Sequence, residues 1–218
     1  MVFDDAQLVR GKSFVIRTKI KTSGGARWLT IPVKKKSGLL NINQIELNTE
    51  IGWREKHCNS IMSNYRKAKY FSNYYKLFED AIKNETDYLL EFNLSIIKLI
   101  MNILKIKTKI IMSSELKVEG RGTEKIVGIL KAVGAKKFLT GLGKGSNRYT
   151  VGKEDLYRKE GFDVVYQKFS TPRYPQLFGD YIPDLSIIDV LFSIGLKKTQ
   201  EIIYSYKYLP TKINENKK

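Results

Sequence analysis

The spacing of apolar residues changes at Trp53, and this change limits how the chain can fold. Before Trp53, over residues 13–33 and 39–47, apolar and polar residues alternate, as they do in half-buried strands. From residue 53 to residue 105, apolar residues recur three and four positions apart, which predicts three helices. We therefore expect a helical segment inserted between β-rich parts of an α/β protein.

The β-rich start contains a hairpin signal. Residues 13–20 and 26–33 are predicted strands, and Gly24 and Gly25 between them supply a tight turn. Residues 39–47 are predicted to form a third strand.

After the helical segment, predicted strands and helices alternate. The strands are at 107–112, 136–141 and 162–169, and the helices are at 122–135, 153–161 and 183–195. Thr123 and Asp184 are the expected N-caps of two of these helices, and Gly134 lies at a C-terminal end. Strands separated by such helices imply right-handed crossovers, so we expect a mainly parallel sheet with βαβ units.

We interpret these elements as parts of one domain. Residues 1–52 form its β-rich N-terminal part, residues 53–106 the helical insertion, and residues 107–209 the α/β part that completes it. Residues 210–218 are expected to be a flexible tail.

Composition limits the chemistry of the chain. Its 218 residues include one cysteine, Cys58, and one histidine, His57, so side chains can form neither an intramolecular disulfide nor a His/Cys metal cage. The most apolar stretch, residues 94–112, contains four lysines, too many for a membrane span. We expect a cytoplasmic location and no metal site, and the sequence points to no particular cofactor or oligomeric state.

Basic residues dominate the charge. Lys and Arg number 39 against 22 Asp and Glu, which gives a formal net charge of +17. Between Asp5 and Glu46 every charged side chain is basic: Arg10, Lys12, Arg17, Lys19, Lys21, Arg27, Lys34, Lys35 and Lys36. Such a segment attracts a small phosphorylated ligand or a nucleic acid, although a solvated basic face has the same composition.

Three β-to-α connections carry candidate site residues, because ligands of open α/β sheets bind beyond the carboxyl ends of the strands. The first contains Asp4 and Asp5, which could act as acid/base carboxylates or only close a turn. The other two supply candidate phosphate-binding or acid/base residues: Ser113, Ser114, Glu115, Gly120, Thr123, Gly141 and Gly143. Each of these two could also be an ordinary turn or helix start, and residues 141–146 lack the P-loop pattern because no helix is expected directly after them.

Several motifs occur in the order and near the spacing of one known family. They are FDDAQ, RTKIKTSGGARWLTIPV, WREKHCNSIMSNYRKAKYF, IKTKIIMSSEL, GTEKIVGILKAVGAKKFLTGLG, GFDVVYQKF and YPQLFGDYIPDLSIIDVLF. Through these motifs, from residue 2 to residue 205, the chain resembles the WbqC-like family. The last motif is the most specific, because these positions match together: Tyr174, Gln176, Phe178, Pro183, Leu185, Ser186 and Asp189.

The resemblance implies two departures from the family pattern. Family members begin earlier, with a strand, a loop rich in Gln and Pro, and a helix, so this chain is expected to start inside the second strand. Where the family often has Asn-Arg-Asn, this chain has Ile16, Arg17 and Thr18.

The resemblance also implies a function. WbqC-like proteins are encoded in O-antigen and other surface-polysaccharide gene clusters, and the implied role is acyl or aminoacyl transfer to an amino sugar or nucleotide-sugar. Arg17 would then bind the phosphates, and Asp4, Asp5 or Glu115 would act as the base. The alternatives are an RNA-binding protein, with tRNA as the favoured partner, and an inactive truncated paralogue that acts by association with other proteins.

The last motif assigns different roles to its polar residues. Tyr174 and Gln176 precede the final predicted helix on a loop, from which they can contact a ligand. Asp189 falls at the edge of an apolar helix stripe, where an unpaired carboxylate is costly. We therefore expect Asp189 to be partnered and to orient its helix.

Overall fold

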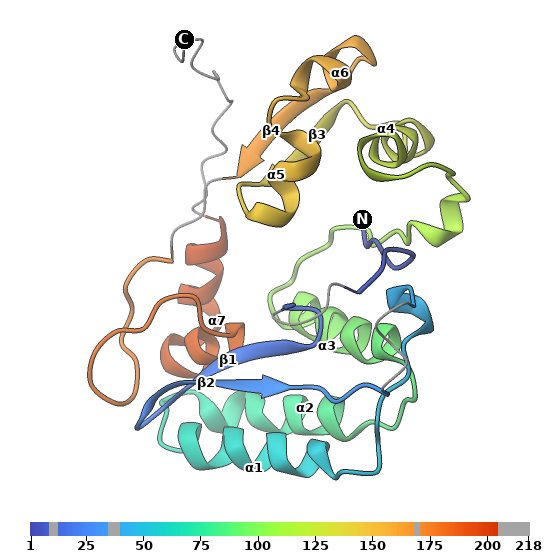
Figure 1. Ribbon diagram of the computed structural model, residues 1–218. Coiled ribbons are helices and arrows are strands. Elements are labelled where there is room, and N and C mark those ends of the chain that lie inside the picture. The colour runs from blue at the N-terminus through green and yellow to red at the C-terminus, as the bar shows by residue number, and fades with distance from the viewer. Residues whose placement is uncertain (9–12, 35–39, 168–170, 205–218) are drawn as a thin grey trace. The chain divides into compact units, whose positions relative to one another are not determined.

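The computed structural model describes residues 1–8, 13–34, 40–167 and 171–204 (Figure 1). Contacts group them into two compact units. The larger unit contains the described residues of 4–110 and 171–204, and the smaller unit contains residues 1–3 and 111–167. The interpretation of residues 1–52, 53–106 and 107–209 as three parts of one domain stays a prediction from the sequence. The following predicted features lie outside the described residues: the tail at 210–218 and the basic side chains of Arg10, Lys12, Lys35 and Lys36.

The larger unit contains a β-hairpin. Its strands β1 (Arg17–Thr22) and β2 (Gly25–Thr30) pair antiparallel, in a register that sets Lys19 opposite Trp28. Gly25 at the turn has a φ of 104°, a conformation that glycine adopts without a Cβ clash. The predicted hairpin is confirmed.

Four α-helices of the described chain belong to the larger unit: α1 (Trp53–Tyr65), α2 (Phe71–Lys83), α3 (Leu89–Ile103) and α7 (Ile187–Tyr204). The three helices predicted between residues 53 and 105 are therefore confirmed. In α2 the buried residues Phe71, Tyr75, Phe78 and Ile82 recur at the predicted spacing of three and four. None of the described helices is long and apolar enough to cross a membrane.

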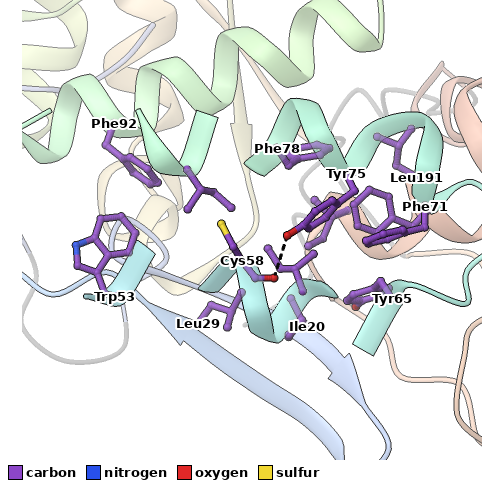
Figure 2. Packing of buried hydrophobic residues seen from close by; sticks show 14 of the residues in the cluster. Ile20, Leu29, Trp53, Cys58, Tyr65, Phe71, Tyr75, Phe78, Phe92 and Leu191 are labelled. Carbon is purple, nitrogen blue, oxygen red and sulfur yellow. Dashed lines mark hydrogen bonds between the residues drawn. The ribbon is translucent and has the colours of Figure 1, made fainter. Parts of the chain in front are cut away.

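The core of the larger unit lies between the hairpin and these helices. Figure 2 shows Ile20 and Leu29 of the hairpin gathered with Tyr65 of α1 and Phe71 of α2. The fully buried ring of Phe192, from α7, makes edge-to-face contacts with Tyr65 and Phe71, at centroid distances of 5.5 and 5.3 Å. Such pairs add about 0.5–1.5 kcal/mol each beyond the burial of apolar area. Helix α7 therefore completes a core whose other residues come from the first half of the chain.

The smaller unit alternates helices and strands. In chain order it has α4 (Gly122–Ala132), β3 (Lys137–Gly141), α5 (Lys144–Thr150), α6 (Glu154–Lys159) and β4 (Asp163–Gln167). β3 and β4 pair parallel, and α5 and α6 connect them, so the predicted βαβ unit is present here. Ile126, Leu130, Tyr157 and Phe162 form the core of this unit.

The extent of the parallel sheet differs from the prediction. The described residues form two two-stranded sheets, of which β1–β2 is antiparallel and β3–β4 is parallel. In place of a strand at 107–112, Met112 makes a single parallel bridge to Val2. A mixed α/β structure is confirmed, whereas a mainly parallel sheet is not.

Within the predicted strand at 39–47, the described residues 40–47 do not form a continuous strand. Ile42–Gln44 is a short 3-10 helix, and bridges pair Asn41 with Gln7 and Glu46 with Tyr88. The Gln44 side-chain oxygen accepts a hydrogen bond from the Asn41 backbone N–H at 3.2 Å. This local side-chain bond competes with strand pairing, which explains why the alternating pattern was misleading here.

Three predicted helix boundaries are also wrong. Arg121, not Thr123, is the N-cap of α4, because the helix already begins at Gly122. α7 begins at Ile187, so Asp184, which lies three residues before the helix with a φ of 57°, is not its N-cap. α5 starts directly after Gly143, where no helix was expected.

Helix α7 is kinked at Gly195. Its backbone there has a φ of 75° and a ψ of 178°, and a Cβ added at this position would lie 2.9 Å from the Tyr70 ring. Glycine is therefore required both by the backbone and by the close approach of Tyr70.

We predict that Gly195→Ala lowers the free energy of unfolding by about 1–3 kcal/mol, because alanine must adopt a disfavoured conformation and displace Tyr70. Urea denaturation followed by circular dichroism measures the change. Gly24→Ala is the control in the same unit, since its φ lies outside the left-handed region and the nearest atom is 3.9 Å from the added Cβ. Equal loss of stability in both variants would contradict the role given to Gly195.

Candidate functional site

The hairpin presents one face away from the core of the larger unit. Side chains alternate between the two faces of a strand, and the buried residues Ile20 and Leu29 face the core. Their neighbours therefore lie on the opposite face, which we call the outer face of the hairpin: Arg17, Lys19 and Lys21 on β1, and Ala26, Trp28 and Thr30 opposite them on β2. This face is basic and carries a large aromatic ring.

Arg17 stacks on Trp28 within the outer face. The guanidinium carbon lies 3.9 Å from the centre of the indole ring, which is 38% exposed. Arg17 Nε is buried and has no hydrogen-bond partner in the described part of the chain. Phe14 contacts the same indole at a centroid distance of 5.8 Å. The ring thus orients a guanidinium whose planar set of donors suits a phosphate or carboxylate.

Lys21 lies further along the same face and is buried beneath the segment 173–186, which we call the C-terminal loop. Its ammonium donates to Gln176 Oε1 at 3.0 Å and to the Asp180 carbonyl at 2.5 Å. The Gln176 side chain in turn exchanges two hydrogen bonds with the backbone of Ile182, at 2.8 and 2.9 Å. The loop is therefore fixed over one end of the outer face.

Asp189 of α7 is fully buried and accepts two hydrogen bonds from tyrosine hydroxyls. Tyr65 donates to Oδ1 at 2.8 Å and Tyr174 donates to Oδ2 at 2.7 Å. The Tyr65 hydroxyl also accepts the backbone N–H of Lys21 at 2.8 Å. The prediction that Asp189 is partnered is confirmed.

The environment of Asp189 shifts its titration. Burial raises the pKa of its carboxyl, while the hydrogen bonds from Tyr174 and Tyr65 and the charge of Lys21 lower it in part. Burial, followed by the charge of Asp189, raises the pKa of both Tyr65 and Tyr174, so both hydroxyls stay protonated as donors. The result is a buried network of five polar side chains: Lys21, Tyr65, Tyr174, Gln176 and Asp189.

Asp4 and Asp5 lie at the start of the larger unit. Asp4 is buried, and its backbone carbonyl accepts the Asn43 N–H at 2.9 Å. Its Oδ2 accepts a hydrogen bond from the Asn43 side-chain amide at 3.3 Å. Asp5 is half-buried. This packing against Asn43 is compatible with turn formation and leaves an acid/base role as a prediction.

The remaining predicted residues lie in the smaller unit. Ser113 is buried and its N–H donates to Val2 O at 2.9 Å, while Ser114 and Glu115 are exposed in a short 3-10 helix, Ser114–Leu116. Gly141 ends β3, and Gly143 is the N-cap of α5.

The start of α4 already uses its polar groups within the protein. Gly120 and Gly122 have positive φ values of 95° and 58°. The Thr123 hydroxyl donates to Tyr149 O at 3.3 Å and accepts from Lys153 Nζ at 3.3 Å. Phosphate binding at this helix start stays a prediction.

His57 and Cys58 do not resemble reactive groups. Burial raises the pKa of the Cys58 thiol to about 11 and lowers that of His57. The thiol is therefore protonated at neutral pH and is a poor nucleophile. Across the described ranges, no three His, Cys, Asp or Glu side chains gather as a metal ion would require.

The structure places the predicted residue Arg17 on Trp28, and it joins the predicted residues Tyr174 and Gln176 to the buried network. Trp28, Lys21 and Tyr65 were not predicted as site residues. Trp28 could have been found, because the hairpin register around Gly24 and Gly25 sets it opposite Lys19. Lys21 and Tyr65 could not have been found in this way. Neither their spacing nor their residue type shows which distant segments they contact.

The chain is similar in sequence to one known protein family and to a curated relative. Residues 1–201 match the WbqC-like protein family. A curated relative, the uncharacterized protein Rv1507c of Mycobacterium tuberculosis (strain ATCC 25618 / H37Rv), is 24% identical over 206 residues, which cover 94% of this chain and 87% of the relative. No solved structure matches the chain.

We predict that Asp189→Asn lowers the free energy of unfolding by about 1–3 kcal/mol, because one tyrosine hydroxyl loses its acceptor and the buried charge of Lys21 loses its counter-charge. Urea denaturation measures the difference. Asp155→Asn is the control, since Asp155 forms an exposed ion pair with Arg158 at 2.7 Å and such pairs are worth about 0–1 kcal/mol. An unchanged Asp189→Asn protein would contradict a stabilising role for the network.

Proposed function

The chain belongs to the WbqC-like protein family, and from this membership we propose that it is a transferase of surface-polysaccharide (O-antigen type) biosynthesis. In this proposal it transfers an acyl or aminoacyl group to the amine of an amino sugar or nucleotide-sugar. The family resemblance supplies the class of reaction, and the outer face of the hairpin supplies a place for a phosphorylated substrate.

The stacking of Arg17 on Trp28 is the observation that carries the proposal. The guanidinium carbon lies 3.9 Å from the ring centre, so the indole fixes the plane of the group. A pyrophosphate offers several acceptor oxygens to such a planar set of donors. Lys19, whose Nζ lies 5.8 Å from the same ring, adds a second positive charge. The half-exposed indole edge adds an apolar surface beside these charges.

The transfer requires a base and a donor with a good leaving group. The sugar amine attacks the acyl carbonyl carbon and a C–N bond forms, while the bond from that carbon to the donor oxygen or sulfur breaks. The proton lost by the amine goes to a carboxylate, for which Asp4, Asp5 and Glu115 are the candidates. Direct transfer is favoured over a covalent intermediate, because the protonated, buried Cys58 is a poor nucleophile.

A second group of residues is proposed to bind phosphate in the smaller unit. Ser113 and Ser114 follow the bridge at Met112, and the glycines Gly120, Gly141 and Gly143 allow backbone N–H groups to approach an anion. They are the alternative location for the substrate phosphates if the outer face of the hairpin does not bind them.

We predict that Arg17→Lys weakens the binding of a uridine-diphosphate amino sugar by about tenfold or more, the loss expected for one charge-assisted hydrogen bond. Lysine keeps the charge but not the planar fork. Isothermal titration calorimetry measures the affinity. Arg27→Lys is the control, because Arg27 is exposed and lies on the opposite face of the same hairpin. Equal affinity in the wild type and Arg17→Lys would exclude Arg17 as the phosphate ligand.

The net charge of +17 favours RNA binding as a second candidate function. We predict that affinity for the uridine-diphosphate amino sugar falls shallowly with salt, because only one diphosphate is neutralised. RNA held by many lysines would instead lose affinity with a log–log slope of about 0.7 per contacted phosphate. Titrations of the sugar nucleotide and of a tRNA over a range of salt concentrations measure both slopes. Tight tRNA binding without measurable sugar-nucleotide binding would favour the RNA-binding function.

A further inference from the structure

We infer that the buried network of Lys21, Tyr65, Tyr174, Gln176 and Asp189 is a positioning device that holds the C-terminal loop as one side of the Arg17 site. This inference rests on the proposed function, because it concerns how the same anion site is built. It assigns Tyr174 and Asp189 an action through the loop rather than contact with the reacting groups.

The contacts of Lys21 place the loop next to the site. Lys21 lies on the outer face of the hairpin, on the same side of β1 as Lys19 and Arg17. Its ammonium contacts Gln176 and Asp180 of the loop at 3.0 and 2.5 Å. The Ser186 N–H donates to Lys19 O at 2.7 Å, so the end of the loop also follows the edge of β1. The loop therefore borders the outer face at Lys19 and Lys21, which lie two and four residues along β1 from Arg17.

The loop needs external support to keep its conformation. Phe178, Gly179 and Asp184 have φ values of 58°, 59° and 57°, all in the left-handed region. For the two non-glycine residues this conformation is disfavoured, and it persists only where surrounding contacts fix it. Tyr174 and Gln176 supply such contacts from within the loop, to Asp189 and to Lys21 and Ile182.

The burial of charged residues in the network is not explained by a gain in stability alone. Lys21 and Asp189 are both almost completely buried, yet they interact through neutral side chains and not as a direct ion pair in the described chain. Removing two such charges from water is costly, and apolar residues of similar volume often give a more stable core. We therefore explain this network by a different role, which is to hold the C-terminal loop in one defined position.

The test compares variants that keep or change the charge of the network. Tyr174→Phe removes one donor to Asp189 without changing any charge, and we expect it to weaken binding of the uridine-diphosphate amino sugar by about tenfold. Asp189→Asn removes a negative charge from the unit that binds the anion. Its effect on the field alone would tighten anion binding, whereas loss of positioning weakens it, so the sign of the change separates the two effects.

The control is Tyr75→Phe, which removes a different buried tyrosine hydroxyl of the larger unit, one that donates to Cys58 O at 3.4 Å on the helical side of the core. It reproduces a loss of stability without touching the loop, and we expect its affinity to equal that of the wild type. Calorimetry is run well below the melting temperature of each variant. Amide hydrogen exchange of the C-terminal loop is measured in parallel and is expected to accelerate in Tyr174→Phe and Asp189→Asn but not in Tyr75→Phe.

The outcomes separate this inference from the proposed function. Weaker binding in Arg17→Lys, Tyr174→Phe and Asp189→Asn, with unchanged Tyr75→Phe, supports both. Weaker binding in Arg17→Lys, with unchanged or tighter binding in Tyr174→Phe and Asp189→Asn, supports the anion site at Arg17 but overturns the positioning role of the network. Unchanged loop exchange in Tyr174→Phe also overturns it. Wild-type affinity in Arg17→Lys overturns both proposals.

Discussion

Tyr65 joins the apolar and the polar centres of the larger unit. Its ring packs edge-to-face on Phe192, and its hydroxyl accepts the Lys21 N–H and donates to Asp189. One side chain of α1 thus contacts β1 and α7 at the same point. The ring contributes to burial of apolar area, while the hydroxyl satisfies a backbone donor and a carboxylate that would otherwise be costly to bury. The positions of the hairpin, of α7 and of the loop before α7 all depend on this residue.

The polar network and the outer face of the hairpin are consecutive parts of one strand. On β1, Arg17 and Lys19 remain on the outer face, whereas Lys21, two residues further along, is covered by the C-terminal loop. Within its six residues, β1 therefore carries both the proposed anion-binding residue Arg17 and the buried structural residue Lys21. Such proximity explains how a site on a small hairpin can be held rigidly, because the strand is fixed on its core face by Ile20 and at one end by Lys21.

Hydrophobic spacing predicted the parts of the structure that are governed by local burial. The helices around Cys58, Phe78 and Phe92 and the hairpin around Gly25 follow from it, because each buries one regular stripe or face. The described residues 40–47 did not form the predicted strand, since the bond between Gln44 and the Asn41 backbone is a polar contact that apolar spacing does not report. The start of α7 was misplaced because Asp184 is a good N-cap by residue type, whereas the helix begins three residues after it.

The candidate site was predictable only where the chemistry is local. Arg17 was found from its place in a basic hairpin, and the need for a partner at Asp189 followed from the apolar stripe around it. The identity of that partner did not, because Tyr65 is 124 positions away in the chain. Lys21 belonged to a basic segment for which a solvated face was one interpretation, but a loop more than 150 residues later covers it, at a sequence separation of 155 to Gln176. Contacts between residues so far apart in the sequence depend on the tertiary structure, and a local sequence pattern does not predict them.

The larger unit is discontinuous in sequence, since its two segments, 4–110 and 171–204, lie on either side of residues 111–167 of the smaller unit. A ribosome delivers the chain from its N-terminus at roughly 5–20 residues per second. The hairpin and helices α1 to α3 therefore leave the exit tunnel while Leu191 and Phe192, which complete their core, have yet to be synthesised. During that interval the apolar side of the nascent hairpin and helices remains uncovered and open to chaperones. The smaller unit, whose described segment from residue 111 to residue 167 is continuous, can complete its fold on the ribosome before its neighbour does.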